Sequence, residues 1–148
     1  MAEHNAATTR ALAKIDRLDL EYILAKAAKD FRWNDKRAVQ AELWYKRFLK
    51  LCYLHRRKPV AAISRNADQL WHYHILDTAR YQRDSRALFG NYLNHQPRYR
   101  RATPEEREAF KESVEMYKDE YGSIPIEAVA VCWRPPAPPP TPPGPPGG

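Results

Sequence analysis

Proline and glycine are distributed very unevenly along this chain of 148 residues. The stretch from Pro135 to Gly148 consists almost entirely of these two residue types, whereas glycine is scarce before it. A segment of that composition cannot build a core, so we expect residues 134–148 to be a disordered tail of polyproline type. The rest of the chain lacks the turn residues of a β protein, and its ordinary apolar fraction predicts a packed helical fold.

Apolar side chains recur at helical spacing over four stretches of the remaining sequence. We therefore predict an all-α fold, a single small bundle of about four main helices over residues 10–29, 35–55, 67–89 and 103–121. Residues 1–9 are expected to be frayed, and residues 10–133 to form the helical domain. The apolar segment 60–63 is expected to be an extended connector.

Residues at the ends of these stretches support the predicted boundaries. Asn34 is suited to cap the second helix, and Pro59 ends it because proline disfavours helix at the residue before it. Thr103, followed by Pro104 and Glu106, has the pattern of a capping box at the start of the fourth helix. Helical phasing then predicts that five large side chains are largely buried, namely Trp44, Phe48, Trp71, Leu76 and Phe110.

The net charge of +7 is not concentrated in a single segment of the sequence. Basic residues gather at 55–58 and 98–101, where they suit phosphates or an acidic protein, but no nucleic-acid motif accompanies them, which ranks nucleic acid as a weak partner. Cys52 and Cys132 match no metal or redox spacing, and no apolar run is long enough to span a bilayer. We expect a reducing, cytoplasmic setting and no membrane partner.

The segment most informative about function is 71–78, in which two histidines lie two residues apart. Successive residues of an α-helix are turned by about 100°, so His72 and His74 would point about 200° apart and could not ligate one ion. His72 would share a face with Asp68. His74 would share a face with four further polar residues, Asp77, Thr78, Tyr81 and Ser85.

Two interpretations of these histidines remain open. In the structural one, a carboxylate holds His72, and His74 is a satisfied polar group between helices. In the functional one, His95 returns from the following loop to the face of His74, and Asp77 or Asp84 completes a three-ligand site for zinc or iron. The candidate metal ligands are therefore His72, His74 and His95, and the pocket around them contains Asp68, Asp77, Thr78, Tyr81, Asp84 and Ser85.

The same segment resembles the bacterial glycine-rich domain-containing protein-like family, which is named after plant and fungal relatives. The resemblance covers about residues 16–125 and implies an all-helical fold, without an established reaction. Its central pattern is Trp71-His72-x-His74-Ile75-Leu76-Asp77-Thr78-x-x-Tyr81-x-x-Asp84, then Phe89-Gly90, then His95-x-Pro97-x-Tyr99.

Two departures from that family's pattern concern residues that are good metal ligands. The family typically has cysteine where this chain has Ser85, and a pair of histidines where it has Asn94 and His95. If the family binds a metal through those positions, the resemblance implies weak or lost metal binding here. If the positions are structural, serine and asparagine are tolerable substitutes.

The sequence therefore ranks three functions. The first is a small helical binding or scaffolding module with a histidine-aromatic pocket for a protein or a small molecule. The second is a metal-binding protein or metal-dependent enzyme that uses His72, His74 and His95 with zinc or iron. The third is nucleic-acid binding through the basic loops. Neither a substrate nor an enzymatic reaction follows from these residues.

Overall fold

The computed structural model describes residues 3–97, 101–126 and 133–137, and within them the fold is all-α, as the sequence predicts. The helices are α1 (Ala6–Asp16), α2 (Glu21–Phe31), α3 (Asp35–Leu54), α4 (Arg65–Leu76), α5 (Thr78–Phe89) and α6 (Pro104–Tyr121). Two short strands, β1 (Val60–Ala61) and β2 (Trp133–Arg134), pair antiparallel.

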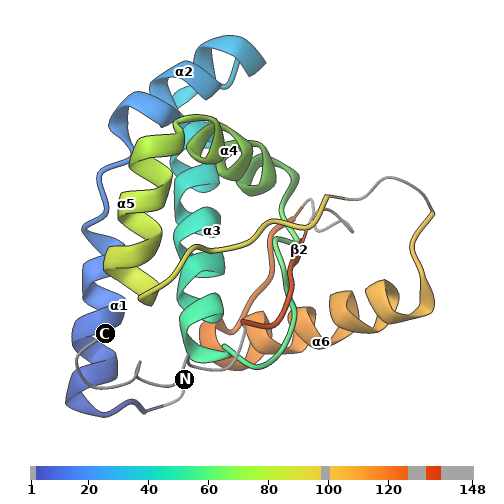
Figure 1. The fold of residues 1–148 in the computed structure, drawn as a ribbon. Helices are drawn as coiled ribbons and strands as arrows, with labels where there is room; N and C mark the ends of the chain where they lie inside the picture. Colours follow the sequence, from blue (N-terminus) through green and yellow to red (C-terminus); the bar gives the residue numbers. More distant parts are fainter. Residues whose placement is uncertain (1–2, 98–100, 127–132, 138–148) are drawn as a thin grey trace, which may run out of the picture.

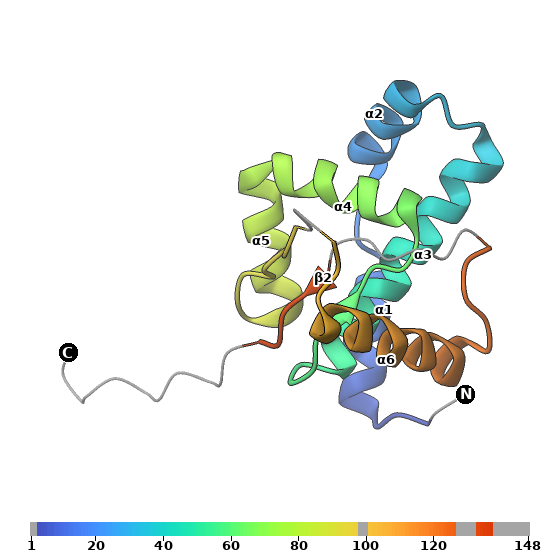
Figure 2. The same ribbon diagram turned by 90° about the vertical axis from the view of Figure 1, so that its right-hand side faces the viewer.

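The long helix α3 forms the axis of the molecule (Figure 1). Helix α4 crosses one end of α3, α1 and α5 lie along one side of it, and α6 crosses near its other end (Figure 1). The turned view places α2 beside α4, and the strands between α4 and α6 (Figure 2). The core lies where α3 meets α4: Phe48 and Trp71 are fully buried, and their ring centroids are 4.6 Å apart.

Several predicted helix ends are confirmed by their caps. The side chain of Asn34 accepts a hydrogen bond from the backbone N–H of Arg37 at the start of α3. Thr103 and Glu106 form both hydrogen bonds of a capping box at the start of α6. Gly90 caps the C-terminal end of α5, and its φ of 80° lies in the left-handed region that glycine adopts without strain.

Two of the four predicted helices are each divided into two. The stretch 10–29 is interrupted between α1 and α2, and the stretch 67–89 bends at Asp77, where ψ of 72° departs from helical geometry. Leu76, the last residue of α4, was expected to be buried but is 74% exposed, because it lies one turn after His72 on the same partly exposed face. Phe110 is only partly buried, whereas Trp44 is buried as expected.

The two ends of the predicted domain also differ from expectation. Helix α1 begins at Ala6, inside the stretch expected to be frayed, because Asn5 caps it by accepting from the N–H of Thr8. Arg134 was placed in the tail, but it lies in β2 and is 2% exposed. Its guanidinium donates to carbonyl groups in the last turn of α3 and in the segment just after it. The tail residues 138–148 lie outside the described residues.

Candidate metal centre on helix α4

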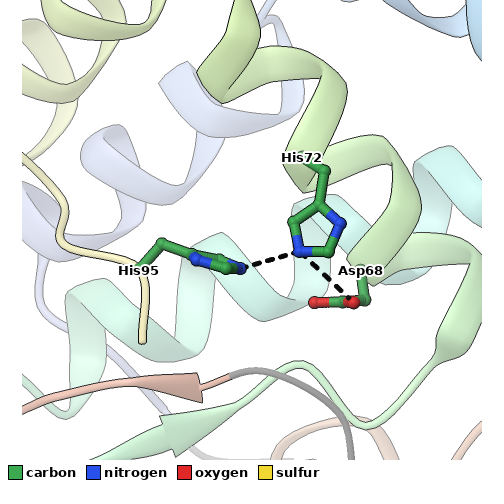
Figure 3. Close-up of side chains that lie close together, drawn as sticks. All are labelled: Asp68, His72 and His95. Carbon is green, nitrogen blue, oxygen red and sulfur yellow. Dashed lines mark hydrogen bonds and ion pairs between the residues drawn. The ribbon is translucent and has the colours of Figure 1, made fainter. Parts of the chain in front are cut away.

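Three potential metal ligands meet beside one face of α4. They are the carboxylate of Asp68 and the imidazoles of His72 and His95, and one ligand atom from each lies within 4.8 Å of the others (Figure 3). The Nε2 atoms of the two histidines are 2.8 Å apart, and Nε2 of His72 is 3.6 Å from Oδ2 of Asp68. We call these three residues the Asp-His-His cluster.

Helix geometry brings two members of the cluster together. Asp68 and His72 are four residues apart in α4, so their side chains lie one above the other on the same face. Asp68 is in the first turn, where its N–H donates to the carbonyl of Ser64. Asp68 is 7% exposed, whereas the side chain of His72 is 41% exposed. The cluster therefore joins a buried carboxylate to an imidazole that solvent reaches.

His95 reaches the cluster because contacts on both sides of it hold its loop. The hydroxyl of Tyr81 donates to the carbonyl of Leu93, and Gln96 pairs through its backbone with Trp133. The ring of Trp71 packs edge-on against the imidazole of His95, with centroids 4.4 Å apart. The imidazole is thus positioned by three separate elements before any ligand binds.

Electrostatics favours the neutral form of His95. Burial, followed by the neighbouring His72, lowers the pKa of His95 to about 4. Neutral imidazole is the form that ligates metals, so a metal that binds His95 at neutral pH does not have to displace a proton from a charged ring. In the contact between the two Nε2 atoms, one ring donates an N–H and the other accepts through a nitrogen lone pair.

His74 lies on the other side of α4, where its two ring nitrogens are both hydrogen-bonded. Nδ1 is 2.7 Å from the hydroxyl of Tyr45 in α3, and Nε2 is 2.9 Å from Oδ2 of Asp84 in α5. Since a carboxylate accepts, Nε2 carries the proton and Nδ1 accepts from Tyr45. Burial lowers the pKa of His74 against the opposing effect of Asp84. We call these residues the Tyr-His-Asp relay.

The bend at Asp77 makes the relay possible. In a straight helix, a residue ten positions after His74 would lie about 15 Å further along the axis, out of hydrogen-bond reach. Because α5 turns back from α4 at Asp77, Asp84 approaches the imidazole instead. Tyr45 was not among the site residues predicted from the sequence. The signal for it was a hydroxyl on the apolar stripe of α3, where a buried polar group requires a partner.

The predicted directions of the two histidines are confirmed, but the predicted place of His95 is wrong. His95 was expected to join His74, whereas it lies against His72, because the contacts of its loop direct it there. His74 does pack on Tyr81 as predicted, with ring centroids 4.9 Å apart. Its own ring nitrogens are occupied in the relay, which separates it from the Asp-His-His cluster.

The remaining predicted pocket residues do not form one site. Asp77 and Thr78 are exposed at the bend, and the carboxylate of Asp77 is 3.1 Å from Nε of Arg80. Ser85 is 3% exposed and interacts with the hydroxyl of Tyr81. Asp84 belongs to the relay. Of the pocket residues that the sequence predicted, only Asp68 belongs to the Asp-His-His cluster.

Comparison with protein families corrects the resemblance drawn from the sequence. A profile of the UCP032817-like family matches residues 15–118. The assignment to the glycine-rich domain-containing protein-like family is therefore wrong, because the resemblance drawn over about residues 16–125 did not distinguish the two families. Comparison with curated proteins and comparison with solved structures each gave no match. Among the described residues, no helix is long and apolar enough to cross a membrane.

Proposed function

The chain belongs to the UCP032817-like family, and for this member we propose that the Asp-His-His cluster binds a divalent transition-metal ion, zinc or iron. The observation that carries the proposal is the convergence of Asp68, His72 and His95, whose ligand atoms lie within 4.8 Å of one another. Two imidazoles and one carboxylate are a ligand set that both zinc and ferrous iron accept.

The spacing of the ligand atoms supports the proposal. Ligands bound at about 2.0–2.2 Å around a tetrahedral ion are about 3.3 Å from one another. Two of the three separations in the cluster, 2.8 Å between the two Nε2 atoms and 3.6 Å from His72 to Asp68, bracket that value, and the ligand atoms of His95 and Asp68 lie within 4.8 Å of each other. Shifts of roughly half an ångström would open the first contact and close the second, which side-chain rotation can supply.

Three protein ligands have a chemical consequence. A closed structural zinc site uses four protein ligands, whereas three leave a position for water or a substrate. The partial exposure of His72 gives solvent access to that position. The proposal is therefore for an open metal site, at which a bound water would be activated or a ligand exchanged.

Elemental analysis tests this proposal directly. The protein is prepared without a histidine tag, from cells supplied with zinc or iron, and handled without oxygen in the iron arm. We expect about one metal ion per chain in the unaltered protein, and loss of the ion in His72→Ala and His95→Ala. His4→Ala is the matched control, because His4 pairs with Glu120 on α6, outside the cluster. A chain that takes up neither zinc nor iron would refute the proposal.

A metal-free result would favour the alternative function, a helical binding or scaffolding module for a protein or a small molecule. The two functions are distinguished by ligand uptake, since a module of that kind gains no stability from zinc or iron. The cytoplasmic location expected from the sequence stays a prediction, which fractionation of cells expressing the full chain tests.

A further inference from the structure

A second group of charged side chains surrounds the C-terminal end of α5. A pocket of about 500 Å³ there is lined by four basic residues and by no acidic residue among those the structure describes. The basic residues come from three parts of the fold that lie together in Figure 1: α1, the segment after α3, and α5 itself. They are Arg10, Lys14, Arg56 and Arg86. We call this the basic pocket.

Two of the four cations are held in place by the end of α5. Nζ of Lys14 donates to the carbonyl of Ala87 at 3.0 Å, and the guanidinium of Arg56 donates to the carbonyl of Phe89 at 3.2 Å. The guanidinium of Arg56 also lies over the ring of Tyr53, 5.1 Å from its centroid. These contacts fix the directions of two positive charges without neutralising them.

The partial negative charge at the C-terminus of α5 does not neutralise the four cations. A helix C-terminus carries about half a negative charge, so four cations leave an excess of roughly three and a half positive charges. None of the four has a carboxylate partner among the residues that the structure describes. Arg10 and Lys14 are one turn apart in α1 and repel each other, and a bound anion would relieve this repulsion.

From these observations we infer that the basic pocket binds a small phosphorylated molecule carrying several negative charges, such as a pyrophosphate or a nucleoside phosphate. Guanidinium groups match phosphate oxygens in pairs, and three of the four cations are arginines. The volume lies within the range of small-molecule sites, and Tyr53 offers an aromatic surface beside the charges. The inference is independent of the metal site, since the two share no residue.

Calorimetric titration of the full chain with pyrophosphate and with ATP, at low ionic strength, tests this inference. The variant Arg10→Gln/Arg86→Gln removes two of the cations and keeps Lys14 and Arg56, which donate to carbonyl groups of α5. Each lost charge-assisted contact should weaken binding about tenfold. The matched control is Lys29→Gln/Lys111→Gln, which lowers the net charge equally at exposed positions outside the pocket. We expect the control and His95→Ala to bind like the unaltered protein.

The possible results separate cleanly. Saturable binding that the pocket variant loses and the control keeps supports the inference. Equal weakening in both double variants would show non-specific attraction by the net charge, and would overturn it. No saturable binding of either probe would overturn it as well. A single-stranded oligonucleotide that binds far more tightly than both probes would replace the small molecule with nucleic acid.

Discussion

The two sides of α4 each carry a histidine, and the two histidines differ in burial and in their partners. His74 is 2% exposed and hydrogen-bonded at both ring nitrogens, to Tyr45 and Asp84. His72, two positions earlier, is partly exposed and lies between Asp68 and His95. The helix period separates them, but what surrounds them decides what each can do. One imidazole completes a buried polar network, whereas the other belongs to a group with the composition of a metal site.

The two histidines differ because other elements of the fold place different side chains beside them. Helix α3 supplies Tyr45, and α5 supplies Asp84, so the relay joins three helices in the core. The cluster receives His95 from a loop instead. A buried network stabilises the fold when all its members are satisfied, and is costly when one is removed. A half-exposed ligand group contributes little until an ion binds. The comparison therefore predicts opposite consequences of similar substitutions.

The largest effect is expected for His74→Ala. This change removes a buried ring and leaves Tyr45 and Asp84 without their shared partner, so we expect a loss of about 3–5 kcal/mol in unfolding free energy. Denaturant unfolding measures it. Metal content per folded chain should be unchanged, since His74 is not in the cluster. If folded His74→Ala also lost its metal, the two sides of α4 would act as one site.

The sequence predicted this division between the histidines but not the residues that complete each side. The helix period alone gives the opposite directions of His72 and His74. The bend at Asp77 has no such signal, because neither glycine nor proline occurs between Ala67 and Phe89. It depends on tertiary packing, and it decides the position of Asp84.

The direction of the His95 side chain could likewise not be predicted from local sequence patterns. It depends on the hydrogen bond from Tyr81 to Leu93 and on pairing of Gln96 with Trp133, a residue distant in the sequence. The caps at Asn34 and Thr103, by contrast, were predictable because each uses residues within three positions. Local rules thus located the helices and the candidate residues, and long-range contacts selected the partners.

The second largest effect is expected from added metal. If the cluster binds zinc, free zinc at about one hundred times its dissociation constant should stabilise the protein by about 2.7 kcal/mol. Thermal unfolding with and without zinc measures this. His95→Ala should remove the stabilisation, and Tyr45→Phe should keep it, since Tyr45 belongs to the relay. Stabilisation of the same size in His95→Ala would place the ion elsewhere.

Acid should destabilise the metal-free protein. The pKa of His95 is lowered to about 4 from an ordinary value of 6.5, and that of His74 is lowered as well, both chiefly by burial. The unfolded chain therefore binds these protons more readily, so stability is full above about pH 6.5 and is lost as the pH falls toward about 4. The thermal midpoint measured across this range should fall less steeply in His95→Gln. An unchanged slope would contradict the assigned shift.

A smaller loss is expected for Tyr45→Phe. The ring stays in the core, but Nδ1 of His74 loses its only donor among the hydrogen bonds described, so we expect a cost of about 1–3 kcal/mol. Denaturant midpoints measure it. Tyr92→Phe is the control, because Tyr92 is 44% exposed and outside the relay. If both variants were equally stable, the relay would not contribute to the fold.

The smallest effect on stability is expected for His72→Ala in the metal-free protein, at about 0.5–1.5 kcal/mol, the usual net contribution of a hydrogen bond such as the one His72 makes with His95. The side chain of His72 is 41% exposed, and its contact with Asp68 at 3.6 Å is long enough for water to screen it. The same variant should abolish metal uptake, so one substitution separates folding from binding. Denaturant unfolding with chelator present, followed by zinc titration, measures both quantities. A loss in the metal-free protein as large as that of His74→Ala would mean that the cluster, like the relay, is part of the structural core.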